Sequence, residues 1–159
     1  YATAIKKGIM QSMTEGPLTG SNCQNIRVCI YDGKMHAVDS NDISFQLAAS
    51  HAFKEAFNEA RPQLLEPYYQ LEVLCEDAYT GDVMGDLQTR RAIIQGMDTE
   101  GHYQKIISEV PLAELKDYGS TLRSLTQGKA KFKLEFSNYQ LVPTHVQESL
   151  VISNAVLSE

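Results

Sequence analysis

The chain of 159 residues is 43% hydrophobic and 21% charged, and its formal net charge at pH 7 is −6. This length suffices for one ordinary domain or two small ones with real cores, and the acidic balance excludes a uniformly basic nucleic-acid binder while leaving room for a local basic patch. No apolar run approaches the roughly 20 residues of a membrane helix, so we expect a cytoplasmic protein without a membrane contact.

The first expected element is a helix over residues 1–13, because apolar side chains recur there at helical spacing. Gly16-Pro17 ends this helix, and a polar loop leads into an expected strand over residues 26–31, where apolar residues alternate with other residues. The chain opens with Tyr1 rather than Met, so we expect a piece cut from a longer protein.

A turn and a second helix are expected next. Asp32-Gly33 is a turn signal, and short oxygen-bearing side chains from Asp39 onward can cap a helix that begins near Ser40. The helix carries an apolar face at a 3.6-residue period and ends before Arg61-Pro62, because proline disfavours helical geometry in the residue that precedes it. We place a domain boundary over residues 62–65.

The second half of the chain predicts a sheet with two helices. Its expected elements in order are a strand over 67–75, a helix over 77–91, a hairpin of strands 92–97 and 103–110, a helix over 111–125, and a strand over 129–136 with Ala130, Phe132, Leu134 and Phe136 facing inward. This βαββαβ order over residues 65–142 predicts a ferredoxin-like antiparallel sheet with both helices on one face and the other face open to a partner. After Pro143, an amphipathic stretch predicts a final helix that returns to the first domain.

Motifs for catalysis are absent from the sequence, which contains no G-x-S-x-G, no H-E-x-x-H and no phosphate-binding G-x-x-x-x-G-K-[ST]. Its three cysteines form no C-x-x-C pair and its four histidines lie far apart, so neither a metal site nor a disulfide is expected. Cys29 and Cys75 fall in expected strands, which favours buried small hydrophobic side chains over nucleophiles. We expect no catalytic residue and no cofactor in this stretch.

Several strings of the sequence resemble, in the same order, the C-terminal region of bacterial elongation factor G. They are residues 4–9 (AIKKGI), 31–40 (YDGKMHAVDS), 64–67 (LLEP), 81–87 (GDVMGDL), 110–114 (VPLAE) and 122–128 (LRSLTQG), together with Arg90-Arg91 and Gly96-Met97. The resemblance implies an α+β chain in which residues 65–142 are the family's ferredoxin-like fifth domain. Residues 1–64 and 143–159 would be its fourth domain, a truncated ribosomal protein S5 domain 2-like α/β fold that lacks its first strands and is completed by the C-terminal helix.

The resemblance further implies a ribosomal GTPase that moves transfer RNA and messenger RNA during elongation, with GTP and magnesium bound in N-terminal domains that this chain lacks. The fourth domain is then a lever whose tip enters the decoding centre, and the matching tip loop contains Gly33, Lys34, Met35, His36, Asp39 and Ser40. An imidazole at a loop apex can donate to phosphate or stack on a base, and Lys34 adds positive charge. The alternative is that His36 is simply an exposed hairpin residue.

For the fifth domain, the resemblance implies contact with large-subunit ribosomal RNA through Gly81, Gly85, Arg90, Arg91 and Lys129. The two glycines share one helix face, where they would let RNA or another helix approach the backbone, or would only allow tight packing of the helix on the sheet. The two arginines could neutralise phosphates or cap the carboxyl end of their helix. Lys129 stands where the family commonly has arginine.

The expected partners are therefore ribosomal RNA of both subunits and the transfer RNA–messenger RNA pair at the decoding centre, bound by a monomer. Two other functions stay open. A tetracycline ribosomal-protection protein also carries fourth and fifth domains, and a free-standing ferredoxin-like module could bind a small ligand or a second copy at its open sheet face.

Overall fold

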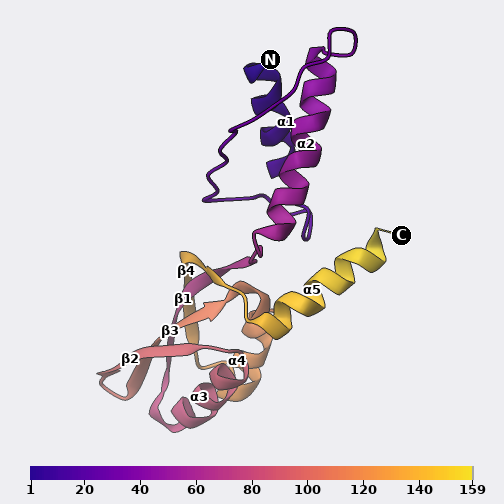
Figure 1. Ribbon diagram of the computed structural model, residues 1–159. Helices are drawn as coiled ribbons and strands as arrows, with labels where there is room; N and C mark the ends of the chain where they lie inside the picture. Colours follow the sequence, from indigo (N-terminus) through magenta and orange to yellow (C-terminus); the bar gives the residue numbers. More distant parts are fainter. Residues whose placement is uncertain (159) are drawn as a thin grey trace. The chain divides into compact units, whose positions relative to one another are not determined.

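The computed structural model describes residues 1–158, and the chain divides into two compact units. Leu65–Val142 form one unit, here called the sheet unit. Tyr1–Leu64 and the segment that starts at Pro143 form the other, here called the helical unit. Figure 1 shows the helices and strands of both.

The helical unit contains α1 (Ala2–Thr14), α2 (Asp42–Glu59) and α5 (Thr144–Leu157). Its small core joins α1 to α2, with Ile9, Ala49 and Phe53 buried and further apolar side chains packed around them. The two helices approach closely at Gly8, where an added Cβ atom would lie only 3.0 Å from the Cα of Gln46. The sequence prediction of two helices with these apolar faces is confirmed.

The start and the end of α2 both have local causes. Asn41 accepts a hydrogen bond from the Ser44 backbone N–H (2.9 Å), and the Asn41 N–H donates to Ser44 Oγ (3.0 Å), which satisfies two otherwise orphaned donors of the first turn. The helix ends at Glu59, ahead of Arg61-Pro62, as the proline predicts.

The strand expected over residues 26–31 is not formed, so this prediction is wrong. The segment has no regular secondary structure, and among residues 1–158 no strand pairs with it. Alternation predicts an extended backbone, but a strand also needs a neighbour that takes up its N–H and C=O groups. Without one, Ile26, Val28 and Ile30 are exposed, and Cys29 is exposed rather than buried as predicted.

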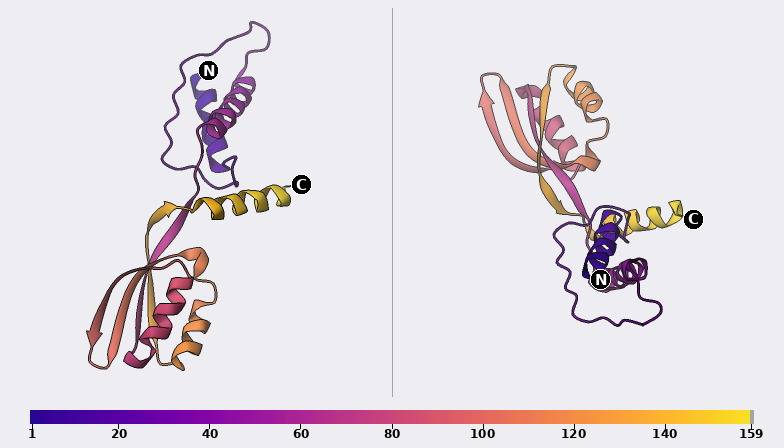
Figure 2. Two further views of the ribbon diagram at one scale, coloured as in Figure 1. Left: turned by 60° about the horizontal axis from the view of Figure 1, so that its bottom comes forward. Right: turned by 90° about the horizontal axis from the view of Figure 1, so that it is seen from above.

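The sheet unit has the predicted βαββαβ order. Its strands are β1 (Leu65–Glu76), β2 (Ile93–Glu100), β3 (Tyr103–Pro111) and β4 (Lys131–Leu141), and its helices are α3 (Thr80–Thr89) and α4 (Tyr118–Thr126). The strands pair antiparallel in the order β2-β3-β1-β4, which confirms the α+β class and the ferredoxin-like arrangement. In Figure 2, α3 and α4 lie on the same side of the sheet.

One face of the sheet forms the core with these two helices. The fully buried side chains Leu71, Val73 and Cys75 alternate along β1, as predicted, and pack with the residues that α3, α4 and β3 contribute. These residues are Val83, Leu87, Ile106, Val110, Tyr118 and Leu122. The opposite face of the sheet has no helix of the same unit on it.

The expected single helix over residues 111–125 is interrupted. Pro111 still belongs to β3, a 3₁₀ turn follows at Leu112–Glu114, and α4 begins only at Tyr118. Asp117 adopts a left-handed backbone conformation with φ 57°, which an α-helix cannot include. Of the leucines whose spacing predicted one helix, only Leu122 is buried, while Leu112 lies in the 3₁₀ turn and is 45% exposed.

The prediction for β4 is right about the face and wrong about the burial. Leu134 pairs with Leu71 and Phe132 with Val73, so the apolar side chains of β4 lie on the helix-covered face. Because β4 is an edge strand, its outer flank has no neighbour in this unit. Phe132, Leu134 and Phe136 consequently remain 42%, 39% and 49% exposed.

The first turn of α5 is fastened to the segment that precedes β1. The Leu64 N–H donates to Gln147 Oε1 (3.0 Å), and Gln147 Nε2 donates to the Pro62 carbonyl (3.2 Å). The amide side chain of Gln147 thus accepts from one backbone N–H and donates to one backbone C=O of the same short segment.

Candidate functional site

The first candidate surface is the loop that connects α1 to α2, whose residues 32–39 are all exposed. Its apolar side chains Met35 and Val38 are 69% and 92% exposed. Residues 37–39 form a turn. The predicted tip loop therefore presents Gly33, Lys34, Met35, His36 and Asp39 to solvent, with Ser40 half-buried behind them.

Hydrogen bonds anchor this loop to the start of α2. The His36 N–H donates to Ser40 Oγ (2.8 Å), and Ser44 Oγ donates to the Asp39 carbonyl (3.0 Å). Ser44 is also the partner of Asn41 in the helix cap, so the same side chain holds both the helix start and the loop. Within residues 1–158, the imidazole of His36 and the ammonium of Lys34 make no hydrogen bond or ion pair. Both are available to a partner.

The second candidate surface is the outer face of α3. Gly81 and Gly85 are exposed, and a Cβ atom at either position would meet no atom within 4 Å. Tight packing of α3 on the sheet therefore does not require these glycines, although each costs about 1 kcal/mol of helix stability relative to alanine. The structure therefore contradicts the explanation that the pair allows tight packing of this helix on the sheet.

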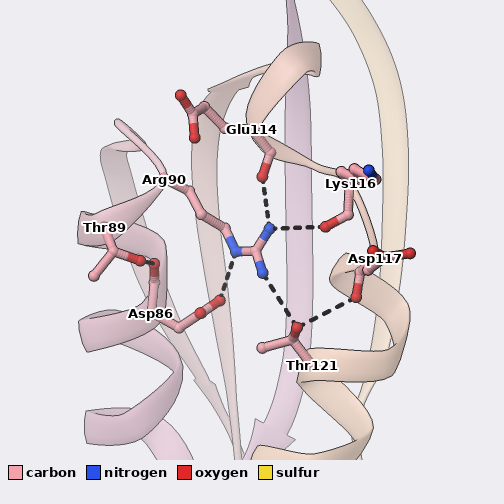
Figure 3. A network of polar contacts seen from close by, with 7 residues as sticks. All are labelled: Asp86, Thr89, Arg90, Glu114, Lys116, Asp117 and Thr121. Carbon is pink, nitrogen blue, oxygen red and sulfur yellow. Dashed lines mark hydrogen bonds and ion pairs between the residues drawn. The ribbon is translucent and has the colours of Figure 1, made fainter.

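Arg90 follows the last turn of α3 and lies inside the sheet unit, with its side chain 14% exposed. Figure 3 shows its guanidinium bonded to the carboxylate of Asp86 (2.9 Å), the carbonyls of Glu114 (2.6 Å) and Lys116 (3.3 Å), and Thr121 Oγ1 (3.3 Å). The guanidinium also lies 5.0 Å from the ring centroid of Tyr118. These contacts tie α3 to α4 and occupy the donors that a phosphate would need.

Arg91 is likewise held by acidic residues of the same unit. It makes two hydrogen bonds to the Glu66 carboxylate (2.7 and 3.1 Å) and one to Glu114 (3.0 Å), and its side chain is 25% exposed. The hydrogen bonds to Glu66 raise the pKa of Arg91 further above its ordinary value, against the opposing effect of burial. Both arginines thus have structural partners that the sequence did not reveal.

Lys129, the remaining predicted contact, lies on the other face of the sheet. Its Nζ is 3.8 Å from Glu76 Oε1, and its side chain is 54% exposed, so this pair is weak and the ammonium is accessible. Of the five predicted residues of the fifth domain, Arg90 and Arg91 are engaged within the sheet unit, while Gly81, Gly85 and Lys129 are exposed.

The chemistry of these surfaces is that of binding. In the described part of the chain, no three His, Cys, Asp or Glu side chains gather as metal ligands would. No described helix is both long and apolar enough to cross a membrane. The exposed groups are an imidazole, ammonium groups and open helix backbone, which suit contacts to phosphate and to bases.

A ferredoxin-like sheet unit and a helical unit with a long exposed loop define a two-unit protein of the α+β class. Two family models match it. "Elongation factor G, domain IV" matches residues 1–61, and "Elongation factor G C-terminus" matches residues 63–150. The chain belongs to the elongation factor G family.

Individual relatives agree with the family models. Over 151 residues, or 95% of this chain, it is 43% identical to elongation factor G of Thermotoga neapolitana and 44% identical to that of Aquifex pyrophilus. The chain spans 22% of the length of each. A crystal structure from Thermus thermophilus superimposes with a TM-score of 0.83 at 44% identity, covering 98% of this chain and 24% of that one.

Proposed function

We propose that this chain is the ribosome-binding end of an elongation factor G that promotes the movement of transfer RNA and messenger RNA, with the loop over residues 32–40 as the tip that enters the decoding centre. The exposed and anchored loop is the observation that supports this proposal most directly. In the whole protein, GTP and magnesium would be bound by other domains. The protein would act in the cytoplasm as a monomer, without a membrane contact.

The shape of the loop suits such a role, because a tip that pushes against RNA needs both exposure and a firm base. Its base is the capped first turn of α2, and its apex presents Lys34 and His36 without partners among the described residues. A cationic side chain and an imidazole can contact phosphate and base, respectively. Met35 between them has no aromatic ring, so contact through stacking falls to His36.

A tetracycline ribosomal-protection protein is the second candidate, since it would use the same two domains. The relatives at 43% and 44% identity are elongation factors, which favours translocation over drug release. Release of tetracycline from ribosomes by the whole protein, without translocation, would reverse this order.

Replacing His36 tests the tip. In the whole protein that carries this chain, we expect His36→Ala to slow translocation about tenfold, since one lost contact of about 1.4 kcal/mol has that effect on a rate. Ribosome-stimulated GTP turnover should change little, because the tip lies outside the nucleotide site. His51→Ala, an exposed histidine on α2, is the matched control and should leave both rates unchanged. Equal losses of translocation and GTP turnover in His36→Ala would contradict a role specific to the tip.

The glycine face of α3 gives a second test with opposite effects on stability and function. We expect Gly85→Ala to stabilise the sheet unit by about 1 kcal/mol, because alanine favours the helix and the added methyl meets nothing. The same variant should weaken ribosome binding if RNA approaches the backbone of α3. Thermal unfolding and ribosome co-sedimentation measure the two effects. Binding that stays unchanged would remove the outer face of α3 from the contact.

A further inference from the structure

The open face of the sheet carries a row of lysines along its β4 edge. Lys131 and Lys133 pair in register with Leu74 and Glu72 of β1, whose side chains point away from the helices, so both lysines belong to the open face. Lys129, just before the strand, has the same parity and reaches Glu76 on that face. All three are exposed.

The row is only partly neutralised by its neighbours. Lys129 makes one long ion pair with Glu76, and Glu72 is engaged at 3.9 Å by Lys105 of the neighbouring strand β3. Glu135 continues the row on the same face and forms no ion pair with any residue of the described range 1–158. Among residues 1–158, Lys131 and Lys133 make no ion pair either. Lys131 and Lys133 are therefore cations without an ion-pair partner on a part of the open face that also carries Glu72, Glu76 and Glu135.

We propose that Lys129, Lys131 and Lys133 bind the phosphate backbone of ribosomal RNA, as a contact separate from the tip loop and the outer face of α3. This inference rests on the proposed function, since it assumes that the chain binds a ribosome. Successive lysines of the row are two strand residues apart, or about 6.6 Å, so each can meet a different phosphate of one strand. The edge position of β4 leaves their outer flank open.

The same lysines have a second effect that the test must separate from RNA binding. Charged side chains on an edge strand discourage pairing with another chain, and β4 has a half-exposed apolar face that needs such protection. Glutamate would protect the edge as well as lysine does, whereas only lysine attracts phosphate. Charge reversal therefore distinguishes the two roles.

The experiment measures the binding of the whole protein to purified ribosomes over a range of salt concentrations. For Lys131→Glu combined with Lys133→Glu, we expect about tenfold weaker binding or more, and a log–log salt slope shallower by about 1.5, since each phosphate contact contributes about 0.7–0.9. Lys116→Glu and Lys54→Glu together form the matched control, with the same charge change at exposed lysines outside the row. The control should keep the original slope.

Three results would overturn the proposal. The first is binding and a salt slope equal to those of the unaltered protein, and the second is an equal loss in the control, which would indicate a general charge effect. The third is self-association of the Lys131→Glu/Lys133→Glu variant, measured by sedimentation. Its weaker ribosome binding would then result from pairing of the β4 edges of two copies. If the unaltered protein itself fails to bind ribosomes, both the proposed function and this inference are wrong. If the unaltered protein binds and the variant binds equally well, only this inference is wrong.

Discussion

Arg91→Met is expected to destabilise the sheet unit by about 3 kcal/mol, the largest loss of any single substitution considered for that unit. The substitution removes the two hydrogen bonds to Glu66 and the one to Glu114. The Glu66 side chain is only 10% exposed, so its carboxylate would remain buried without a counter-charge. Arg91→Lys should recover only part of the loss, because an ammonium cannot form the two-point contact.

Native-state hydrogen exchange measures this effect within one molecule. The amides of Val73 and Ile106 report the free energy of opening the sheet unit, and the amide of Phe53 in the helical unit is the internal control. Adding Glu66→Met to Arg91→Met should restore most of the stability, since replacing both members of a buried pair by apolar groups is often neutral. A loss below about 1 kcal/mol for Arg91→Met alone would show that Glu66 is solvated and not dependent on Arg91.

Gly8→Ala should destabilise the helical unit by about 2–3 kcal/mol, although alanine is the better helix former. The added methyl would overlap the backbone of Gln46 at the crossing of α1 and α2, and backbone atoms in a helix cannot move aside as a flexible side chain can. The helices would have to separate and would expose the small core around Ile9 and Phe53.

The matched control is the same change at Gly85, where the methyl meets nothing and should stabilise its helix. Opposite signs at the two positions would separate close packing from helix propensity. The amide of Phe53 reports the first variant and the amide of Val83 the second. Stabilisation by Gly8→Ala would mean that α1 does not approach α2 as closely as in this structure.

Most of the fold follows from the sequence where burial and periodicity coincide. The strand expected over residues 67–75 is confirmed as β1, in which Leu71, Val73 and Cys75 are fully buried because a strand between two neighbours buries every second residue. Phe132 and Leu134 show the same alternation and are half-exposed, because the position of a strand within its sheet is set by pairing with distant segments. Residues 26–31 show the limit of the same signal, since alternation cannot supply a neighbouring strand.

The sequence predicted an exposed loop around His36, but it did not predict the partners that engage Arg90 and Arg91. An exposed loop was expected from the turn signal Asp32-Gly33, but the turn of the structure lies at residues 37–39, directly after the exposed His36. Apart from Asp86, which is four residues from Arg90, the side-chain partners of the two arginines lie more than 20 residues away in sequence, at Glu66, Glu114 and Thr121. Only the three-dimensional pairing of β1, α3 and α4 reveals that these cations are already engaged.

Leu65 and Leu141 are register partners on adjacent strands, so the sheet unit is inserted into the helical unit through two neighbouring points of the chain. A nascent chain that emerges from its amino end would finish the inserted unit while α5 is still unmade. Gln147 can join Pro62 and Leu64 only after that. The contact that joins α5 to residues 62–64 thus links residues 83 and 85 positions apart, and it can form only after the whole sheet unit has been synthesised.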